Sequence, residues 1–180
     1  ERIATFDPDI TIFAFGKGLS PDDDMRQVIL TNSIYPVEVA KWLHTHTRCR
    51  CFIQLGTCFE YGHSTSGELL SENSVPRPFN VYGASKLSTR FALEHFSQTS
   101  GDQVIYLLLF TLFGPGEATG RVTPTLFNAA QNYLPAHFSD GLQERDFVYS
   151  ADVSLFMVRL LEERYRLPQW QLLNVCSGER

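Results

Sequence analysis

The sequence lacks several features that mark whole classes of protein. Among its 180 residues, no apolar run approaches the ~20 residues that a membrane-spanning helix needs. No signal-peptide core follows the charged start Glu1-Arg2. The net charge is −5 and there is no basic run or stripe, which argues against a nucleic-acid partner. We therefore expect a protein that engages neither a membrane nor nucleic acid.

Cysteine is also scarce. The four cysteines, Cys49, Cys51, Cys58 and Cys176, include no Cys-x-x-Cys pair, so the sequence predicts neither a zinc site nor a disulfide framework. We expect no metal, and a reducing cytoplasm as the compartment. The overall composition is typical of a globular protein, because a hydrophobic content of 43% in a chain of 20.4 kDa suffices for one sizeable core.

The stretch Tyr82-Gly83-Ala84-Ser85-Lys86 places a phenol and an amine four residues apart. Residues 81–97 contain no internal proline and have apolar residues at helical spacing, which predicts a helix with Tyr82 and Lys86 on one face. A nearby ammonium favours the phenolate, so Tyr82 could exchange a proton near neutral pH. A tyrosine and a lysine at this spacing also occur by chance on many helices.

Alternating strands and helices predict an α/β fold, a parallel doubly wound (Rossmann-like) three-layer sheet. The expected strands are residues 9–15, 52–57, 103–110 and 170–175, and the expected helices are 21–45, 81–97, 121–133 and 152–165. The Pro21-Asp22-Asp23-Asp24 stretch supplies capping oxygens for the first helix, and Pro36 predicts a kink within it. His44 and His46 do not share a helix face, and we expect both to be solvated.

Thr57 ends a predicted buried strand, where open α/β sheets bind their ligands. Around it, five ordered motifs resemble the extended short-chain dehydrogenases/reductases, the NAD-dependent epimerase/dehydratase group that acts mostly on nucleotide-sugars. The motifs are Thr57-Cys58-Phe59-Glu60-Tyr61-Gly62, Pro78-Phe79-Asn80-Val81-Tyr82-Gly83-Ala84-Ser85-Lys86, Phe113-Gly114-Pro115-Gly116-Glu117, Arg145-Asp146-Phe147-Val148-Tyr149 with Asp152-Val153, and Leu173-Asn174-Val175-Cys176-Ser177-Gly178-Glu179. The resemblance covers nearly the whole chain.

The resemblance implies a catalytic triad. Tyr82 would exchange a proton with a sugar hydroxyl or ketone, Lys86 would lower the pKa of Tyr82 and hold the nicotinamide ribose, and Thr57 would hydrogen-bond the reacting oxygen. It implies NAD or NADP contacts at Phe15, Gly16, Asn32, Tyr82, Lys86, Phe110 and Leu112, and substrate contacts at Cys58, Phe59, Thr111 and Arg145. A buried Asn32 that satisfies a neighbouring backbone group is an equal alternative. The partner implied is a nucleotide-diphosphate sugar, and the assembly is a cytoplasmic homodimer.

The glycine-rich turn that grips the cofactor in this family is missing. Gly16-Lys17-Gly18 resembles instead the loop after the family's fourth strand. We therefore expect residues 1–180 to be part of a longer enzyme, a partial NAD(P)-binding domain without its first βαβ units and its C-terminal end. Residues 114–147 and 166–180 would form part of the substrate-binding region. The missing second strand leaves NAD versus NADP open.

Some residues depart from the family patterns, and these departures reduce the number of reactions that fit the sequence. Members that remove water across C4 and C6 carry Asp-Glu after the threonine, whereas this chain has Cys58-Phe59, so a 4,6-dehydratase is disfavoured. Thr111 replaces a common asparagine, which leaves the sugar open. A 4-epimerase and a 4-ketoreductase both remain. The alternative from another class is a non-catalytic dinucleotide-binding or assembly protein of the same fold.

Overall fold

The computed structural model describes residues 2–18, 24–63, 69–141 and 143–179. In chain order the elements are α1 (Arg2–Phe6), β1 (Ile10–Phe13), α2 (Met25–Ile29), η1 (Leu30–Ile34), α3 (Tyr35–His46), β2 (Cys51–Thr57), η2 (Cys58–Glu60), α4 (Val81–Ser100), β3 (Gln103–Leu109), β4 (Thr111–Phe113), α5 (Val122–Asn132), β5 (Phe147–Tyr149), α6 (Ser150–Glu163), η3 (Arg164–Arg166) and β6 (Trp170–Val175). All the strands and helices expected from the sequence are present, and α1, β4 and β5 were not predicted.

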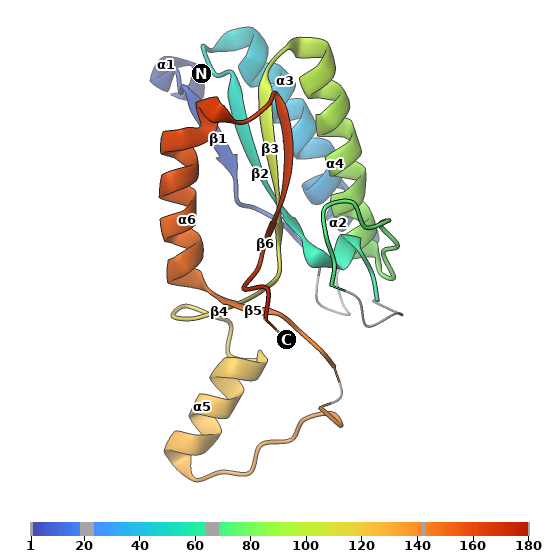
Figure 1. Cartoon of the computed structure of the whole chain (residues 1–180), viewed down its shortest axis with the longest axis vertical. Coiled ribbons are helices and arrows are strands. Elements are labelled where there is room, and N and C mark those ends of the chain that lie inside the picture. The colour runs from blue at the N-terminus through green and yellow to red at the C-terminus, as the bar shows by residue number, and fades with distance from the viewer. Residues whose placement is uncertain (1, 19–23, 64–68, 142, 180) are drawn as a thin grey trace. The chain divides into compact units, whose positions relative to one another are not determined.

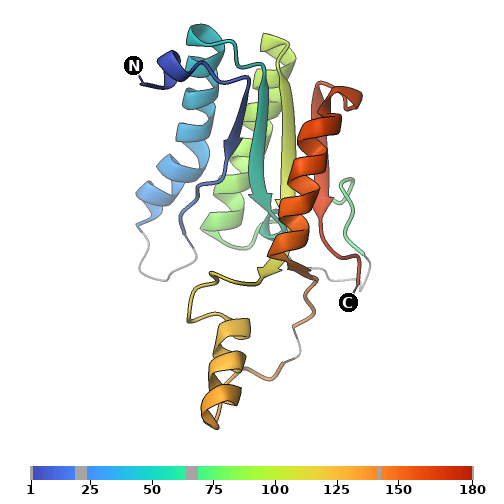
Figure 2. The same ribbon diagram turned by 90° about the vertical axis from the view of Figure 1, so that its left-hand side faces the viewer.

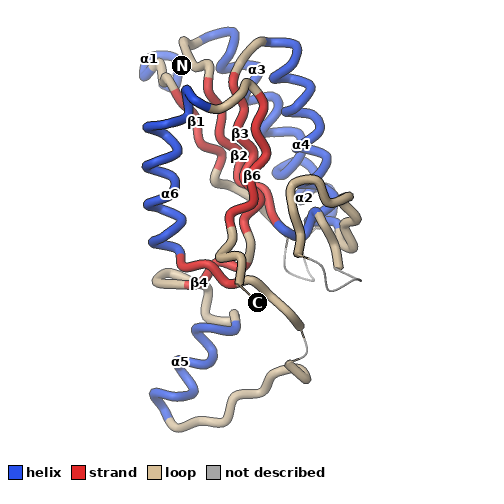
Figure 3. Tube along the Cα trace, viewed as in Figure 1, coloured by secondary structure: helices blue, strands red, loops and turns tan. Residues whose placement is uncertain are grey.

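A four-stranded sheet has the order β1-β2-β3-β6 (Figure 3). β1 pairs with β2, and β2 with β3, in parallel register. Along β3, the Val104 N–H donates to the Gln169 carbonyl oxygen and the Phe110 N–H donates to the Val175 carbonyl oxygen. Residue numbers therefore increase in the same direction along both paired segments. Parallel strands joined through helices confirm the predicted Rossmann-like α/β class.

The chain divides into two compact units. The first comprises residues 1–109 and 165–174, and the second comprises residues 110–164 and 175–180. In the first unit, α3 and α4 lie side by side and α4 packs on β2 and β3 (Figures 1 and 2). In the second, β4 and β5 form a parallel pair and α6 packs on β5.

The core of the first unit is the middle of β2 and β3. Phe52 and Ile53 are fully buried, and so are all five residues from Val104 to Leu108. These runs are apolar without alternation, as expected for parallel strands that are covered on both faces. This packing fixes the position of the carboxyl end of β2, where Thr57 is the last residue.

The helix before β2 is interrupted by a π-helical turn, η1, directly before Pro36 in the first turn of α3. In an α-helical pattern a Pro36 N–H would bond the Asn32 carbonyl, and proline has no N–H. The Thr89 hydroxyl of α4 donates to that carbonyl instead. Of the capping residues predicted for this helix, Asp24 accepts from the Arg26 N–H at 3.0 Å, and residues 21–23 lie outside the described ranges.

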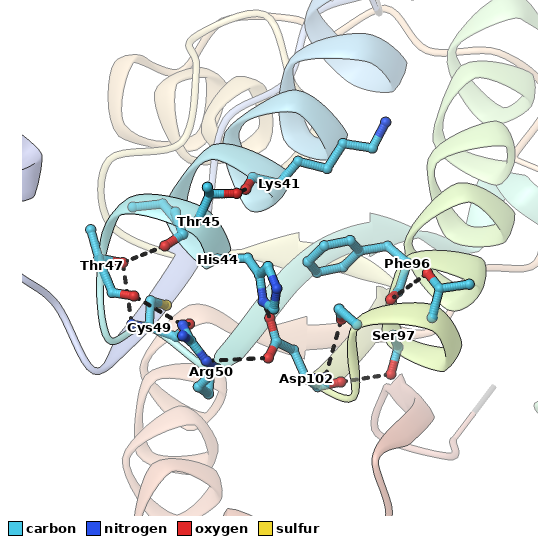
Figure 4. A network of polar contacts seen from close by, with 12 residues as sticks. Lys41, His44, Thr45, Thr47, Cys49, Arg50, Phe96, Ser97 and Asp102 are labelled. Atoms are coloured by element: carbon cyan, nitrogen blue, oxygen red, sulfur yellow. Dashed lines mark hydrogen bonds and ion pairs between the residues drawn. The ribbon is translucent and has the colours of Figure 1, made fainter.

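His44, which the sequence predicts to be solvated, is so only in part, because its side chain is 36% exposed and also pairs with a buried carboxylate. Its Nδ1 lies 2.7 Å from Oδ2 of Asp102, whose side chain is only 2% exposed (Figure 4). The Arg50 Nε lies 3.7 Å from the other oxygen of Asp102. A buried carboxylate requires such partners. The cluster joins α3, the start of β2 and the turn between α4 and β3. His46 is exposed, as predicted.

Candidate active site

Thr57 is fixed by the turn that follows β2. Its hydroxyl oxygen accepts from the Phe59 N–H at 3.3 Å, and its own N–H donates to Oε1 of Glu60 at 3.2 Å. This reciprocal pair is a capping box, which determines how the chain leaves the strand. The Thr57 side chain is thus oriented at the carboxyl end of a central parallel strand, and Thr57 is only 6% exposed.

Tyr82 lies in the first turn of α4. The helix begins there because the Asn80 side chain accepts from the Gly83 N–H at 2.8 Å. A side-chain carbon at Gly83 would lie 2.5 Å from the Phe59 carbonyl oxygen, so glycine lets the helix start approach η2 closely. The Tyr82 ring is half-buried and stands edge-on to Phe59, with ring centroids 6.2 Å apart.

One helical turn later, Lys86 is 2% exposed. Its ammonium donates to the carbonyl oxygens of Leu55, at 3.1 Å, and Phe15, at 3.2 Å. Burial lowers the pKa of Lys86 to about 8, and the charge of Glu60 acts in the opposite direction. The structure thus places a buried ammonium where the chain leaves β1 and near the end of β2.

The segment after β1 is held against Lys86 from two sides. A side-chain carbon at Gly16 would lie 3.2 Å from the Lys86 Nζ, so the absence of a side chain permits the close approach. Asn32 binds the backbone of Lys17 twice, with its Oδ1 2.9 Å from the N–H and its Nδ2 2.7 Å from the carbonyl oxygen. Asn32 also donates to the Ser85 hydroxyl at 2.9 Å. These contacts fit the backbone role that the sequence left open for Asn32.

The remaining predicted residues of the first unit, Cys58 and Phe59, are half-buried in η2 directly after Thr57. Phe59 belongs to a cluster of packed rings that also includes Phe79 and His63. The Phe59 ring stands edge-on to Phe79 at 5.8 Å, and Phe79 stacks on His63 at 4.1 Å between centroids. Tyr82 therefore has an aromatic neighbour on this side.

Four predicted residues belong to the second unit. Phe110, Thr111 and Leu112 are half-buried, and Arg145 is exposed. Thr111 and Leu112 lie in β4. This strand pairs with β5, which begins shortly after Arg145 in the sequence. Within this unit the Thr111 N–H donates to the Asp146 carbonyl at 3.0 Å. The two predicted substrate contacts of this unit, Thr111 and Arg145, thus belong to neighbouring segments.

Asp146 is a structural residue that the sequence did not single out. Its carboxylate accepts from the Ser177 N–H and hydroxyl, at 2.8 and 3.0 Å, and from the Gly178 N–H at 2.8 Å. Two motifs far apart in the sequence are joined by these bonds. The sequence shows that both motifs occur in one chain, but it does not indicate which side chain connects them.

A second group that the sequence missed lies behind the site. Glu60 and Tyr106 are fully buried, and Arg90 is nearly so. Burial raises the pKa of Glu60 to about 7, against the opposing effects of the Thr57 N–H and the Arg90 charge. The spacing Thr57-x-x-Glu60 is that of a capping box and could have identified the carboxylate. Nothing local could have identified Arg90 and Tyr106 as its neighbours.

Across the residues that the structure describes, no helix combines the length and apolarity that crossing a bilayer demands. Within the same ranges, no group of three or more histidine, cysteine, aspartate or glutamate side chains is placed to hold a metal ion.

Known proteins resemble the chain over different extents. It is 29% identical over 130 residues to the uncharacterized UDP-glucose epimerase YtcB of Bacillus subtilis, covering 72% of this chain and 40% of that protein. It is 25% identical over 186 residues to the GDP-6-deoxy-D-mannose reductase of Pseudomonas aeruginosa, covering 96% of this chain and 59% of that protein. The chain therefore spans less than two thirds of the length of these relatives.

Solved structures share the fold. A UDP-glucuronic acid 4-epimerase mutant from Bacillus cereus, in complex with a fluorinated UDP-sugar and NAD, has a TM-score of 0.86 at 21% identity, covering 99% of this chain and 58% of that one. RMD from Pseudomonas aeruginosa, complexed with NADPH, has a TM-score of 0.85 at 24% identity, covering 96% of this chain and 61% of that one. A model of the NAD dependent epimerase/dehydratase family matches residues 2–176. The chain belongs to the NAD dependent epimerase/dehydratase family.

Proposed function

We propose that this chain is the catalytic part of an NAD(P)-dependent nucleotide-sugar enzyme that oxidises or reduces one sugar carbinol or ketone. The observation that carries the proposal is the buried Lys86 ammonium, which lies where the chain leaves β1 and near the end of β2, one helical turn after Tyr82. Burying an ammonium is costly, so a site that keeps one in place one helical turn from a phenol favours proton transfer over mere packing.

In the proposed mechanism, Tyr82 is the acid or base. With a pKa of about 8, Lys86 stays largely protonated at neutral pH, and an ammonium one helical turn from Tyr82 would favour the phenolate form of Tyr82. Thr57 orients the reacting oxygen through its hydroxyl, which its capping box holds in place. The nicotinamide, when bound, supplies the hydride chemistry.

The residues present fit a dinucleotide. Gly16 lets the backbone after β1 lie against the Lys86 ammonium, because a side-chain carbon there would sit 3.2 Å from the Nζ. We propose that Lys86 and Tyr82 contact the nicotinamide ribose, and that Phe15, Gly16 and Asn32 line the cofactor on the β1 side. Phe110 and Leu112 are the proposed contacts from the second unit. Both NAD and NADP are compatible with these residues.

For the substrate we propose a nucleotide-diphosphate sugar, with Cys58, Phe59, Thr111 and Arg145 as contacts. An exposed guanidinium such as Arg145 suits a diphosphate, which it can bind in a bidentate manner. Dehydration requires an acid and a base beside the sugar, and the Phe59 side chain can be neither, which disfavours a 4,6-dehydratase. The reaction proposed is therefore a 4-epimerisation or a 4-ketoreduction. A cytoplasmic homodimer is the assembly proposed, and the mass of the full-length protein in solution tests it.

The experiment uses the full-length protein with Tyr82→Phe. Turnover of nucleotide sugars should fall by about two to four orders of magnitude while cofactor affinity is kept, because the ring remains and only the proton donor is lost. Tyr165→Phe is the matched control, since Tyr165 is 72% exposed and remote from the site in sequence. Unchanged turnover in Tyr82→Phe would instead support a non-catalytic dinucleotide-binding protein.

A further inference from the structure

Glu60 is the most enclosed charged residue next to the candidate site. It is 0% exposed, and its Oε1 accepts hydrogen bonds from two elements. One donor is the Thr57 N–H at 3.2 Å, and the other is the Tyr106 hydroxyl of β3 at 3.0 Å. A fully buried carboxylate is rarely retained without such partners.

Tyr106 continues the connection to the helix that carries Lys86. Its hydroxyl lies 2.8 Å from the Lys86 carbonyl oxygen as well as 3.0 Å from Glu60. A phenol has one hydrogen and cannot donate fully to both acceptors. Tyr106 therefore shares its hydrogen between Glu60 and the Lys86 carbonyl oxygen, and so links the carboxylate to the helix that carries Lys86.

The other oxygen of Glu60 faces a cation at an unusual distance. Its Oε2 lies 3.7 Å from Nη1 of Arg90, too far for a hydrogen bond, and within the described part of the chain neither atom has another hydrogen-bond partner. Arg90 lies one helical turn after Lys86 on α4, so both cations act on the same carboxylate. The surroundings thus fully stabilise neither the anionic nor the neutral form of Glu60.

Glycine at position 56 makes room for this arrangement. A side-chain carbon there would overlap the Tyr106 ring and would lie 2.7 Å from Oε1 of Glu60. The backbone of β2 is therefore built to let the carboxylate and the phenol meet directly behind Thr57.

We propose that Glu60 is a positioning residue for Thr57 and Lys86. One carboxyl group holds the Thr57 backbone and, through Tyr106, the Lys86 carbonyl, and its negative charge stabilises the Lys86 ammonium. The inference deepens the proposed function and rests on it for its catalytic meaning. The titratable and charged groups facing Glu60 are Lys86 and Arg90 from α4, Tyr106 from β3 and the adjacent Tyr61.

A consequence is that two proton equilibria are coupled. With the pKa of Glu60 near 7 and that of Lys86 near 8, Glu60 becomes anionic over the range in which Lys86 begins to lose its proton. The anion opposes that loss. The Glu60 anion thus favours the charged form of Lys86 up to about pH 8, and the pH profile of turnover should contain an inflection near 7 that is due to Glu60.

The test measures the pKa of Lys86 by carbon-13 NMR of lysine-labelled full-length protein. Glu60→Gln keeps the shape and the acceptor oxygen but removes the charge, and the pKa of Lys86 should shift downward by about one unit. Glu38→Gln, at an exposed residue that pairs with Lys41, is the matched control and should leave it unchanged. An unchanged pKa of Lys86 in folded Glu60→Gln overturns the proposal.

A second variant covers the case in which Glu60→Gln does not fold. Tyr106→Phe removes the hydroxyl that lowers the pKa of Glu60, so the Glu60 carboxyl, followed with glutamate labelling, should titrate at higher pH than in the wild type. Titration at the same pH in both proteins counts against the proposal. These readouts need no substrate, so loss of turnover in Tyr82→Phe tests the proposed function separately.

Discussion

The Lys86 ammonium lies 3.1 Å from the Leu55 carbonyl oxygen and connects the helix that carries Tyr82 to the end of the central strand. The same nitrogen lies 3.2 Å from the Phe15 carbonyl oxygen. A single side chain therefore links the segment after β1, β2 and α4 at the carboxyl ends of the strands, where parallel α/β proteins bind their ligands.

Replacing Lys86 by methionine should lower kcat by about one to three orders of magnitude, because a neighbouring ammonium lowers the pKa of a phenol by about one to three units. The activity that remains should rise with pH as Tyr82 ionises without assistance. Steady-state kinetics of the full-length protein across pH give both values. Lys41→Met, at a surface lysine, is the control. A pH profile equal to that of the wild type would contradict the role given to Lys86.

Stability should depend on pH through Glu60. Its pKa is about 7 in the folded state against an ordinary value of 4.5, so the folded state holds a proton that the unfolded chain releases. The favourable contribution is complete below about pH 4.5 and is lost as pH rises to about 7. The gap corresponds to about 3 kcal/mol.

Urea unfolding of the wild type and Glu60→Gln at several pH values measures this effect. The difference in unfolding free energy between the two proteins should change over that window, with the wild type losing stability relative to the variant as pH increases. A pH-independent difference would show that Glu60 has its ordinary pKa in the folded protein.

Gly56→Ala should destabilise the fold by about 1–3 kcal/mol, because the added carbon would overlap Tyr106 and crowd Glu60. Gly120→Ala is the matched control. Gly120 is exposed and has no atom within 4 Å of where the added carbon would sit. Equal unfolding midpoints for the two variants would mean that β2 and β3 tolerate a side chain behind Thr57.

Asp102→Asn should cost about 1–3 kcal/mol, since it removes the buried charge that both His44 and Arg50 contact (Figure 4). Asp9→Asn, at an exposed residue that pairs with Arg48, should cost less than about 1 kcal/mol. Thermal unfolding of both variants checks this. The cluster lies outside the candidate site, so kcat should be unaffected by either substitution.

The sequence was sufficient where the signal is local. The helix of Tyr82 and Lys86 was predictable from its apolar spacing and lack of proline, and Thr57 from its place after an apolar run. The three-residue strands β4 and β5 are too short for any periodicity. Their pairing depends on contacts between segments far apart in the chain.

The sequence was insufficient where buried polar groups meet across elements. Asp102 reaches His44 from 58 residues away, and Tyr106 reaches Glu60 from 46 residues away. Spacing on one helix says nothing about such partners. The rule that applies is that buried polar groups find partners, and it identifies them only once the fold is known.

The most direct test is the transient appearance of reduced nicotinamide when the full-length protein, loaded with NAD or NADP, is mixed with nucleotide sugars. This measurement detects hydride transfer in an epimerase, and also in a ketoreductase run in reverse. We predict rapid reduction of the nicotinamide in the wild type, with a rate lower by about two to four orders of magnitude in Tyr82→Phe. Equal rates in the two proteins would contradict the account.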